Sequence, residues 1–173
     1  MIKTIAAFIL LTACAHAQQT PPQLPTCSAP EFRAFDFWVG EWDVVVTGTE
    51  NRAGSSVIGK ENADCVITEH WTSARGPYTG QSLNMYDRAT GHWNQYYMDS
   101  TGEVTRFEGG PFENGMRLLD PANVAAGQSA PLQTRMTFTA NADGTVRQHG
   151  ETSPDGATWT TSYDLTYRRR TAQ

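Results

Sequence analysis

The feature that most constrains the fold is a succession of short, alternating apolar and polar segments separated by turns that contain glycine. Turn signals stand at 87–91, 100–102, 141–144 and 153–156, and no segment after residue 41 has a helical period. The strands are predicted at 41–47, 55–63, 65–73, 81–86, 92–100, 103–108, 115–120, 132–140, 145–152 and 158–169. A meander this long has two edges to protect, and closing it removes both. The sequence therefore predicts an all-β fold, a single antiparallel up-and-down barrel of eight to ten strands.

Composition agrees with one packed domain and argues against nucleic acid as a partner. The 173 residues are 39% hydrophobic and 18% charged, which favours a globular core over disorder. The net charge is −5, and the one basic cluster, 168–170, stands at the end of the chain. A mildly acidic chain without a basic stripe does not fit a phosphate backbone.

The N-terminus resembles an export signal. Lys3 is followed by an apolar stretch at 5–13 and by an A-x-A site at 15–17, so 1–17 is predicted to be a signal peptide. Residues 11–14 also resemble a lipoprotein box, in which Cys14 would carry the lipid. Both alternatives place the mature protein outside the cytoplasm, periplasmic or extracellular, with membrane attachment only if Cys14 is lipidated.

A linker rich in proline is predicted at 18–31, before a barrel domain at 32–170. The apolar and aromatic stretch 32–38 is expected to form a short helical turn that closes one end of the barrel. Besides Cys14, the chain has Cys27 and Cys65, which allow one pairing in an oxidising compartment. We expect a disulfide between them; two unrelated buried thiols are the alternative.

Several short motifs occur together in a specific order. The stretch 35–43 reads F-D-F-W-V-G-E-W-D; C-x-I-x-E-x-W follows from Cys65, G-x-S-x-N-x-Y-D from Gly80, W-x-Q-x-Y-x-D from Trp93 and Y-x-R from Tyr167. This order resembles an uncharacterised family of secreted bacterial proteins with a lipocalin-like, calycin-type β-barrel. The resemblance covers about residues 32–170 and implies the fold; it brings no established activity.

Gly40-x-Trp42 also resembles the G-x-W signature of the wider lipocalin superfamily. There the tryptophan packs at the closed end of the barrel and a basic residue of the last strand stacks across it. The resemblance implies that Gly40 allows a sharp entry into the first strand, that Trp42 fills the floor, and that Arg169 lies over its indole ring. A role of these three residues in contacting a ligand is the alternative.

Catalytic and metal-binding motifs are absent from the sequence. There is no nucleophile elbow, no C-x-x-C, no H-E-x-x-H and no glycine loop for phosphate. His70, His92 and His149 lie on different predicted strands without ligand spacing. We therefore predict no metal and no cofactor. A metal site assembled across strands, or a haem iron bound by one of these histidines, remains as a minor alternative.

Polar residues embedded in aromatic strands are the candidates for a ligand site. Because side chains alternate in a strand, residues two apart share one face. The predicted ligand-binding residues are Glu69, Trp71, Asn84, Gln95, Tyr97 and Asp99. Another face is expected to carry Trp159, Thr161, Tyr163, Leu165 and Tyr167. The first set forms a cavity wall, a buried polar network or a solvated face, and Arg106 is a possible partner for its carboxylates.

These features favour an exported barrel that binds a small, partly apolar molecule. An enzyme, a hydrolase or isomerase, is the second hypothesis, with Glu69 or Asp99 as general base in a pocket that raises its pKa. A structural envelope protein without ligand is the third, because side chains can fill a small barrel completely. A carboxylate that titrates near neutral pH favours the enzyme, and ordinary titration favours the carrier.

Overall fold

The computed structural model describes residues 26–120 and 132–171. The predicted signal peptide at 1–17, the alternative lipidation site Cys14 and most of the proposed linker lie outside the described residues. So does most of the loop between the seventh and eighth predicted strands.

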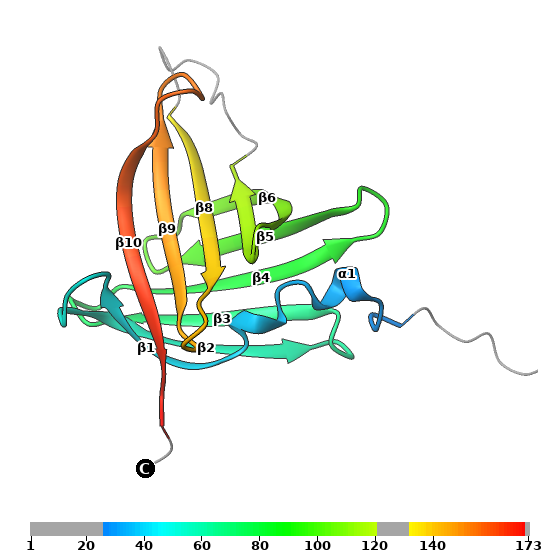
Figure 1. Ribbon diagram of the computed structural model, residues 1–173, viewed down its shortest axis with the longest axis horizontal. Helices are drawn as coiled ribbons and strands as arrows, with labels where there is room; N and C mark the ends of the chain where they lie inside the picture. The colour runs from blue at the N-terminus through cyan, green and yellow to red at the C-terminus, as the bar shows by residue number, and fades with distance from the viewer. Residues whose placement is uncertain (1–25, 121–131, 172–173) are drawn as a thin grey trace, which may run out of the picture.

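Ten antiparallel strands form one closed barrel (Figure 1). They are β1 Gly40–Val46, β2 Arg52–Glu61, β3 Val66–Ser73, β4 Thr79–Asp87, β5 His92–Asp99, β6 Val104–Phe112, β7 Gly115–Leu119, β8 Gln133–Ala140, β9 Val146–Ser153 and β10 Thr160–Arg169. Each strand pairs with its neighbours in sequence, and β1 pairs with β10 to close the ring, with Trp42 opposite Arg169. The predicted fold class is confirmed, and the strands match the predicted segments to within a few residues.

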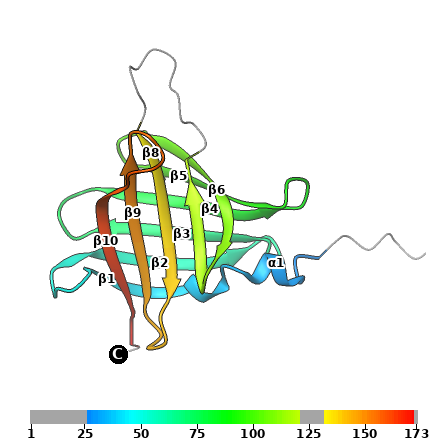
Figure 2. The same ribbon diagram turned by 45° about the horizontal axis from the view of Figure 1, so that its top comes forward.

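The barrel is strongly twisted. Strands β2–β5 on one side cross β8–β10 on the other at a steep angle (Figures 1 and 2). Alternate residues point inward, as Met116 and Leu118 on β7 and Met136 and Phe138 on β8 show by their burial. The core is therefore formed by every second residue of these strands, as the alternation of apolar and polar residues predicts.

A β-bulge in β10 corrects one prediction about faces. The pairing of β10 with β9 shifts register between Thr161 and Tyr163, so the residues on either side no longer alternate regularly. Tyr163 points into the barrel, whereas Thr161 is exposed and hydrogen-bonded to His149 on the outside. Trp159 lies outside as well, under the guanidinium of Arg135 at 3.9 Å. The expectation that Trp159 and Thr161 share a face with Tyr163 is wrong.

Two short helical segments fill one end of the barrel. They are α1 Pro30–Arg33, where proline suits the first helical turn, and η1 Asp36–Trp38. Phe35 and Trp38 are fully buried and stack with their ring centroids 4.9 Å apart. Phe138 and Trp93 pack against Phe35 at 5.0 and 5.7 Å. The expected helical turn that closes the barrel is present, although its helix begins at Pro30, inside the segment expected to be linker.

The G-x-W residues lie beside this aromatic cluster. Trp42 is fully buried and donates a hydrogen bond from Nε1 to the carbonyl of Trp38 at 2.9 Å. The guanidinium of Arg169 lies 4.4 Å from the centroid of the Trp42 indole. Gly40 has a φ of 148°, and a Cβ there would come within 2.5 Å of Arg169 Nη1, so glycine lets the arginine lie across the ring. The geometry expected from the resemblance is present.

A disulfide joins Cys27 to Cys65, as predicted, with an S–S distance of 2.00 Å. It fastens the chain before α1 to the turn between β2 and β3, and the indole of Trp93 donates to the carbonyl of Glu31 at 3.1 Å beside it. Within the described residues, α1 and η1 are the helices, and neither has the length and hydropathy to cross a membrane.

Candidate functional site

A cavity of about 330 Å³ lies inside the barrel, next to the aromatic cluster that fills its closed end. Phe107, Met136 and Tyr167 belong both to the core cluster and to the cavity wall, so they form its floor. The lining residues are Glu69, Trp71, Tyr78, Gln95, Tyr97, Thr105, Phe107, Met136, Gln148, Tyr163, Leu165 and Tyr167. Apolar walls with a few polar groups are typical of small-molecule sites of this size.

Glycines on neighbouring strands leave room for the large aromatic side chains of the wall. A Cβ at Gly80 would come within 2.0 Å of the Tyr97 hydroxyl, and one at Gly150 within 2.2 Å of the Tyr163 ring. Trp71 lies in the same way against Gly54, at 2.6 Å. Because these rings lie close against the backbone of the next strand, space remains in the middle of the barrel.

Glu69 is the one acidic side chain among the described residues that line the cavity, and it is only 5% exposed. Ser56 on β2 donates to Oε1 at 2.9 Å, and Ser82 on β4 donates to Oε2 at 3.2 Å. None of the described residues that line the cavity is a lysine, arginine or histidine. The carboxyl group therefore has hydroxyl donors from both neighbouring strands but no cationic partner.

Burial dominates the protonation of this site. It raises the pKa of Glu69 to about 7, against the opposing hydrogen bonds of Ser56, Ser82 and Tyr167. Burial also raises the pKa of Tyr97, Tyr163 and Tyr167 above the ordinary tyrosine value. At neutral pH the cavity thus contains neutral phenols around one carboxyl group that is poised between its two protonation states.

Gln95 and Asn84 form a buried amide chain beside Glu69. Gln95 Nε2 donates to Asn84 Oδ1 at 2.7 Å, and Asn84 Nδ2 donates to Ser82 Oγ at 2.9 Å and to the carbonyl of Ile67 at 3.0 Å. Gln95 lines the cavity, but Asn84, although fully buried, does not. Gln95 therefore belongs both to the cavity wall and to the internal network, and Asn84 belongs to the network alone; neither lies on a solvated face.

The wall formed by β9 and β10 was not assigned to the site from the sequence. Tyr167 donates to Gln148 Oε1 at 2.7 Å, and Gln148 Nε2 lies 3.4 Å from the Tyr163 hydroxyl. The shared face of Tyr163, Leu165 and Tyr167 was the available signal. What the sequence could not show is that ring closure brings β10 across from β3 and β5.

Asp99 lies at the mouth of the barrel and does not line the cavity. Its Oδ1 accepts hydrogen bonds from the backbone and side chain of Thr101 at 2.8 and 2.6 Å, which organises the turn after β5. Its Oδ2 accepts from the Tyr78 hydroxyl at 3.0 Å, and Tyr78 in turn contacts the Tyr97 hydroxyl at 3.1 Å. The hydrogen bond from the Thr101 side chain lowers the pKa of Asp99, so this carboxylate is ionised and engaged. Of the six predicted site residues, Glu69, Trp71, Gln95 and Tyr97 line the cavity.

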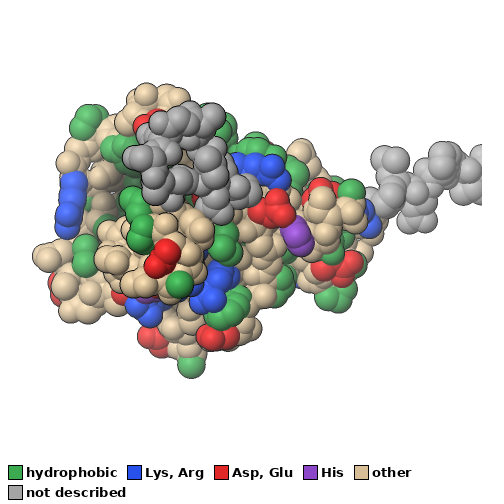
Figure 3. All heavy atoms as spheres, turned by 90° about the horizontal axis from the view of Figure 1, so that it is seen from above, with side chains coloured by type: hydrophobic (Ala, Val, Ile, Leu, Met, Phe, Trp, Pro, Cys, Tyr) green, Lys and Arg blue, Asp and Glu red, His purple; other side chains and the backbone are tan. Residues whose placement is uncertain are grey.

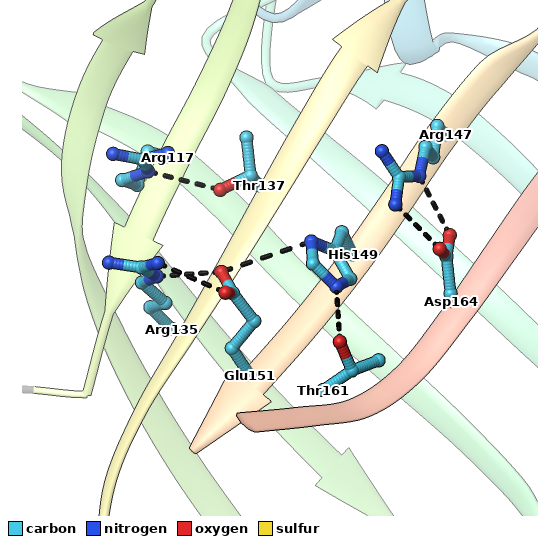
Figure 4. A network of polar contacts seen from close by, with 8 residues as sticks. All are labelled: Arg117, Arg135, Thr137, Arg147, His149, Glu151, Thr161 and Asp164. Carbon is cyan, nitrogen blue, oxygen red and sulfur yellow. Dashed lines mark hydrogen bonds and ion pairs between the residues drawn. The ribbon is translucent and has the colours of Figure 1, made fainter. Parts of the chain in front are cut away.

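The charged side chains of β7–β10 belong to the outer surface. Arg135 pairs with Glu151 at 2.7 Å, and His149 Nε2 lies 2.9 Å from Thr161 Oγ1 (Figure 4). Arg147 pairs with Asp164 at 2.6 Å in the same network. These groups are partnered with one another and lie on the opposite side of the sheet from the cavity.

His70 and His92 also lie outside the barrel. His70 is exposed on β3, and His92 Nδ1 contacts Glu108 Oε1 at 2.5 Å. Among the described residues, no group of three acidic, histidine or cysteine side chains is placed to hold a metal ion. Arg106 donates hydrogen bonds to Asn94 and Glu108 on the outer face. It therefore does not pair with the carboxyl group of Glu69, for which the sequence offered it as a partner.

On the described part of the face shown in Figure 3, positive and negative side chains are interspersed.

No family model matches the chain, and no curated protein matches it.

Proposed function

We propose that this protein is an exported, lipocalin-like barrel that binds a small, partly apolar molecule. The observation that carries the proposal is the interior cavity of about 330 Å³, whose walls combine aromatic rings with a carboxyl group, amides and phenols. A barrel built only for structure would gain stability by filling this space with side chains. The disulfide supports export, because such bonds persist in oxidising compartments.

The test compares binding to the wild type and to a variant with a filled cavity. Thr105 lines the cavity, whereas Val104, next to it on β6, is 67% exposed on the outer face. A panel of aromatic compounds of similar size and different charge is titrated by calorimetry. We expect at least one compound to bind the wild type and Val104→Trp, and none to bind Thr105→Trp. If no compound binds, or if Thr105→Trp binds as the wild type does, the carrier function is wrong and a structural barrel is the better account.

A second function, proton transfer by an enzyme, is favoured by one observation: the carboxyl group of Glu69 is buried at the cavity, and this burial raises its pKa. A carboxylate with a pKa of about 7 is suited to act as a general base, and neutral tyrosine hydroxyls could donate to a developing oxyanion. Asp99 does not fit this role because its Oδ1 is engaged in the turn after β5 and its Oδ2 accepts a hydrogen bond from Tyr78. Exchange of α-protons of an aryl ketone in deuterated water, accelerated by the wild type and not by Glu69→Gln, would favour the enzyme over the carrier.

The export signal itself remains part of the proposal. Cleavage after Ala17 gives a mature protein that begins at Gln18, and intact-mass measurement of the protein from a native-type host tests it. A mass with acyl chains on Cys14 would contradict this cleavage and make the protein membrane-anchored, since two or more chains anchor stably.

A further inference from the structure

The carboxyl group of Glu69 bears on the charge of the ligand, which the proposed function leaves open. An ionised carboxylate in an apolar interior is costly unless a positive charge or several donors compensate it. Here the donors are the neutral hydroxyls of Ser56, Ser82 and Tyr167, and none of the described cavity-lining residues is cationic. The compensating charge has to come from outside the described protein, or the group has to be protonated.

The walls around Glu69 suit a cation as well. Trp71, Tyr97 and Tyr163 present aromatic rings to the cavity, and an organic cation is attracted to the faces of such rings. Phe107, Met136 and Leu165 supply an apolar surface for the rest of the molecule. An anionic ligand, in contrast, would meet a carboxyl group and negative ring faces with no cation to receive it.

We infer that the cavity selects small organic cations, whose ammonium group meets Glu69 while an apolar remainder lies against the aromatic wall. This rests on the proposed binding function and names its ligand class. A cavity of about 330 Å³ accommodates a single-ring aralkylammonium ion with space for some ordered water. The ligand binds the ionised form of Glu69, so it displaces a proton whenever that group is protonated.

The other titratable groups near Glu69 do not compete for this role. Tyr97 on β5 and Tyr163 and Tyr167 on β10 have pKa values raised by burial, so they stay neutral. Tyr78 at the mouth also has a raised pKa through burial. Asp99 stands behind Tyr78 and is ionised throughout, so it adds a negative charge at the entrance without changing between pH 6 and 8.

The experiment uses three probes of similar shape: the phenethylammonium cation, neutral 2-phenylethanol and the 3-phenylpropanoate anion. Calorimetry at pH 6 and pH 8, in buffers of different ionisation enthalpy, gives the affinity and the protons released. Because the pKa of Glu69 is about 7, we expect affinity for the cation to rise about tenfold from pH 6 to pH 8. Close to one proton is released per cation bound at pH 6, and the anion does not bind.

Two variants identify the group responsible. Glu69→Gln keeps the shape of the side chain and should lose the preference for the cation, the proton release and the pH dependence, while binding 2-phenylethanol as the wild type does. Retained alcohol binding shows that the variant is folded with an open cavity. Glu61→Gln, the same substitution at an exposed position of β2, should behave as the wild type does.

The outcomes separate this inference from the proposed function. If the wild type binds the alcohol as tightly as the cation at pH 8, or if Glu69→Gln still prefers the cation, the cation inference is overturned while the carrier function stands. If none of the three probes binds at either pH, both fail.

Discussion

At the scale of single residues, whether burial of a side chain stabilises the fold depends on the partners of its polar atoms. Glu69 and Trp42 are both almost inaccessible, but Trp42 gains from burial and Glu69 does not. The indole has one polar atom, and its partner is the carbonyl of Trp38. The carboxyl group has hydroxyl partners but keeps a raised pKa, which means that its charged form is destabilised in the folded protein.

Glu69 is predicted to make stability depend on pH. Its pKa is 4.5 without the fold and about 7 within it, so the folded state binds the additional proton between these values. The contribution of this proton to the free energy of unfolding is therefore fully present below pH 4.5 and is lost as the pH rises through 7. The whole contribution is roughly 3 kcal/mol. Urea unfolding from pH 5 to pH 8 should show Glu69→Gln gaining stability relative to the wild type as the pH rises. If the difference in unfolding free energy between the two proteins is constant across this range, Glu69 is not buried without a cationic partner.

The G-x-W tryptophan is predicted to be a major contributor to stability. Trp42→Ala removes a fully buried ring and should cost about 3–5 kcal/mol. Arg169→Ala removes the stacked guanidinium, which is itself exposed, and should cost about 0.5–2 kcal/mol. Urea midpoints measure both. An unchanged midpoint for Trp42→Ala would show that the ring does not hold the closed end.

At the scale of elements, the cavity exists because strands with inward glycines stand next to strands with inward aromatics. The pairs are Gly54 with Trp71, Gly80 with Tyr97 and Gly150 with Tyr163. On the closed side, Phe35, which precedes η1, and Trp38 of η1 are fully buried and occupy the interior. One barrel thus has a packed half and a hollow half, and the inward residues of each strand differ accordingly.

Gly150→Ala on β9 is predicted to disturb the cavity wall through Tyr163 on the neighbouring strand β10. The added methyl meets the ring of Tyr163 and has to push it inward, at a cost of about 1–3 kcal/mol in stability. Binding of 2-phenylethanol should weaken as well. Gly110→Ala on β6 is the matched control, because its Cβ meets nothing within 4 Å. If the two variants have the same stability and affinity, the aromatic wall is not positioned by the glycine.

The disulfide is predicted to stabilise the closed end. It closes a loop of 38 residues, for which the chain-entropy model gives about 4 kcal/mol. The Cys27→Ser, Cys65→Ser double variant should unfold at correspondingly lower urea concentration, and thiol counting on denatured, non-reduced wild type should find neither Cys27 nor Cys65 free. Two reactive thiols in the wild type would contradict the bond.

At the scale of the whole molecule, the periodic pattern and the turns were enough to predict a closed antiparallel barrel and its strands. The disulfide was predicted from the two cysteines that remain beside Cys14 and from the export signal. The part of the wall formed by β3 and β5 was also largely predictable, because β4 joins these two strands in consecutive hairpins and such strands are adjacent. Asn84 could not be separated from the lining residues, since its place depends on the depth of each side chain in the barrel. The bulge at 161–163 reverses faces without a mark in the residue pattern. Gln148 and Tyr163 became part of the site only through ring closure.

The most direct test of the account is the titration of the Glu69 carboxyl carbon by NMR, without and with saturating phenethylammonium. The free protein should show a pKa of about 7, because the group is buried without a cation. With the ligand bound, the pKa should fall, since the ammonium group stabilises the ionised form. If Glu69 titrates as an ordinary glutamate in the free protein, or if its pKa does not change when the cation is present, this carboxyl group is not the recognition group of the cavity.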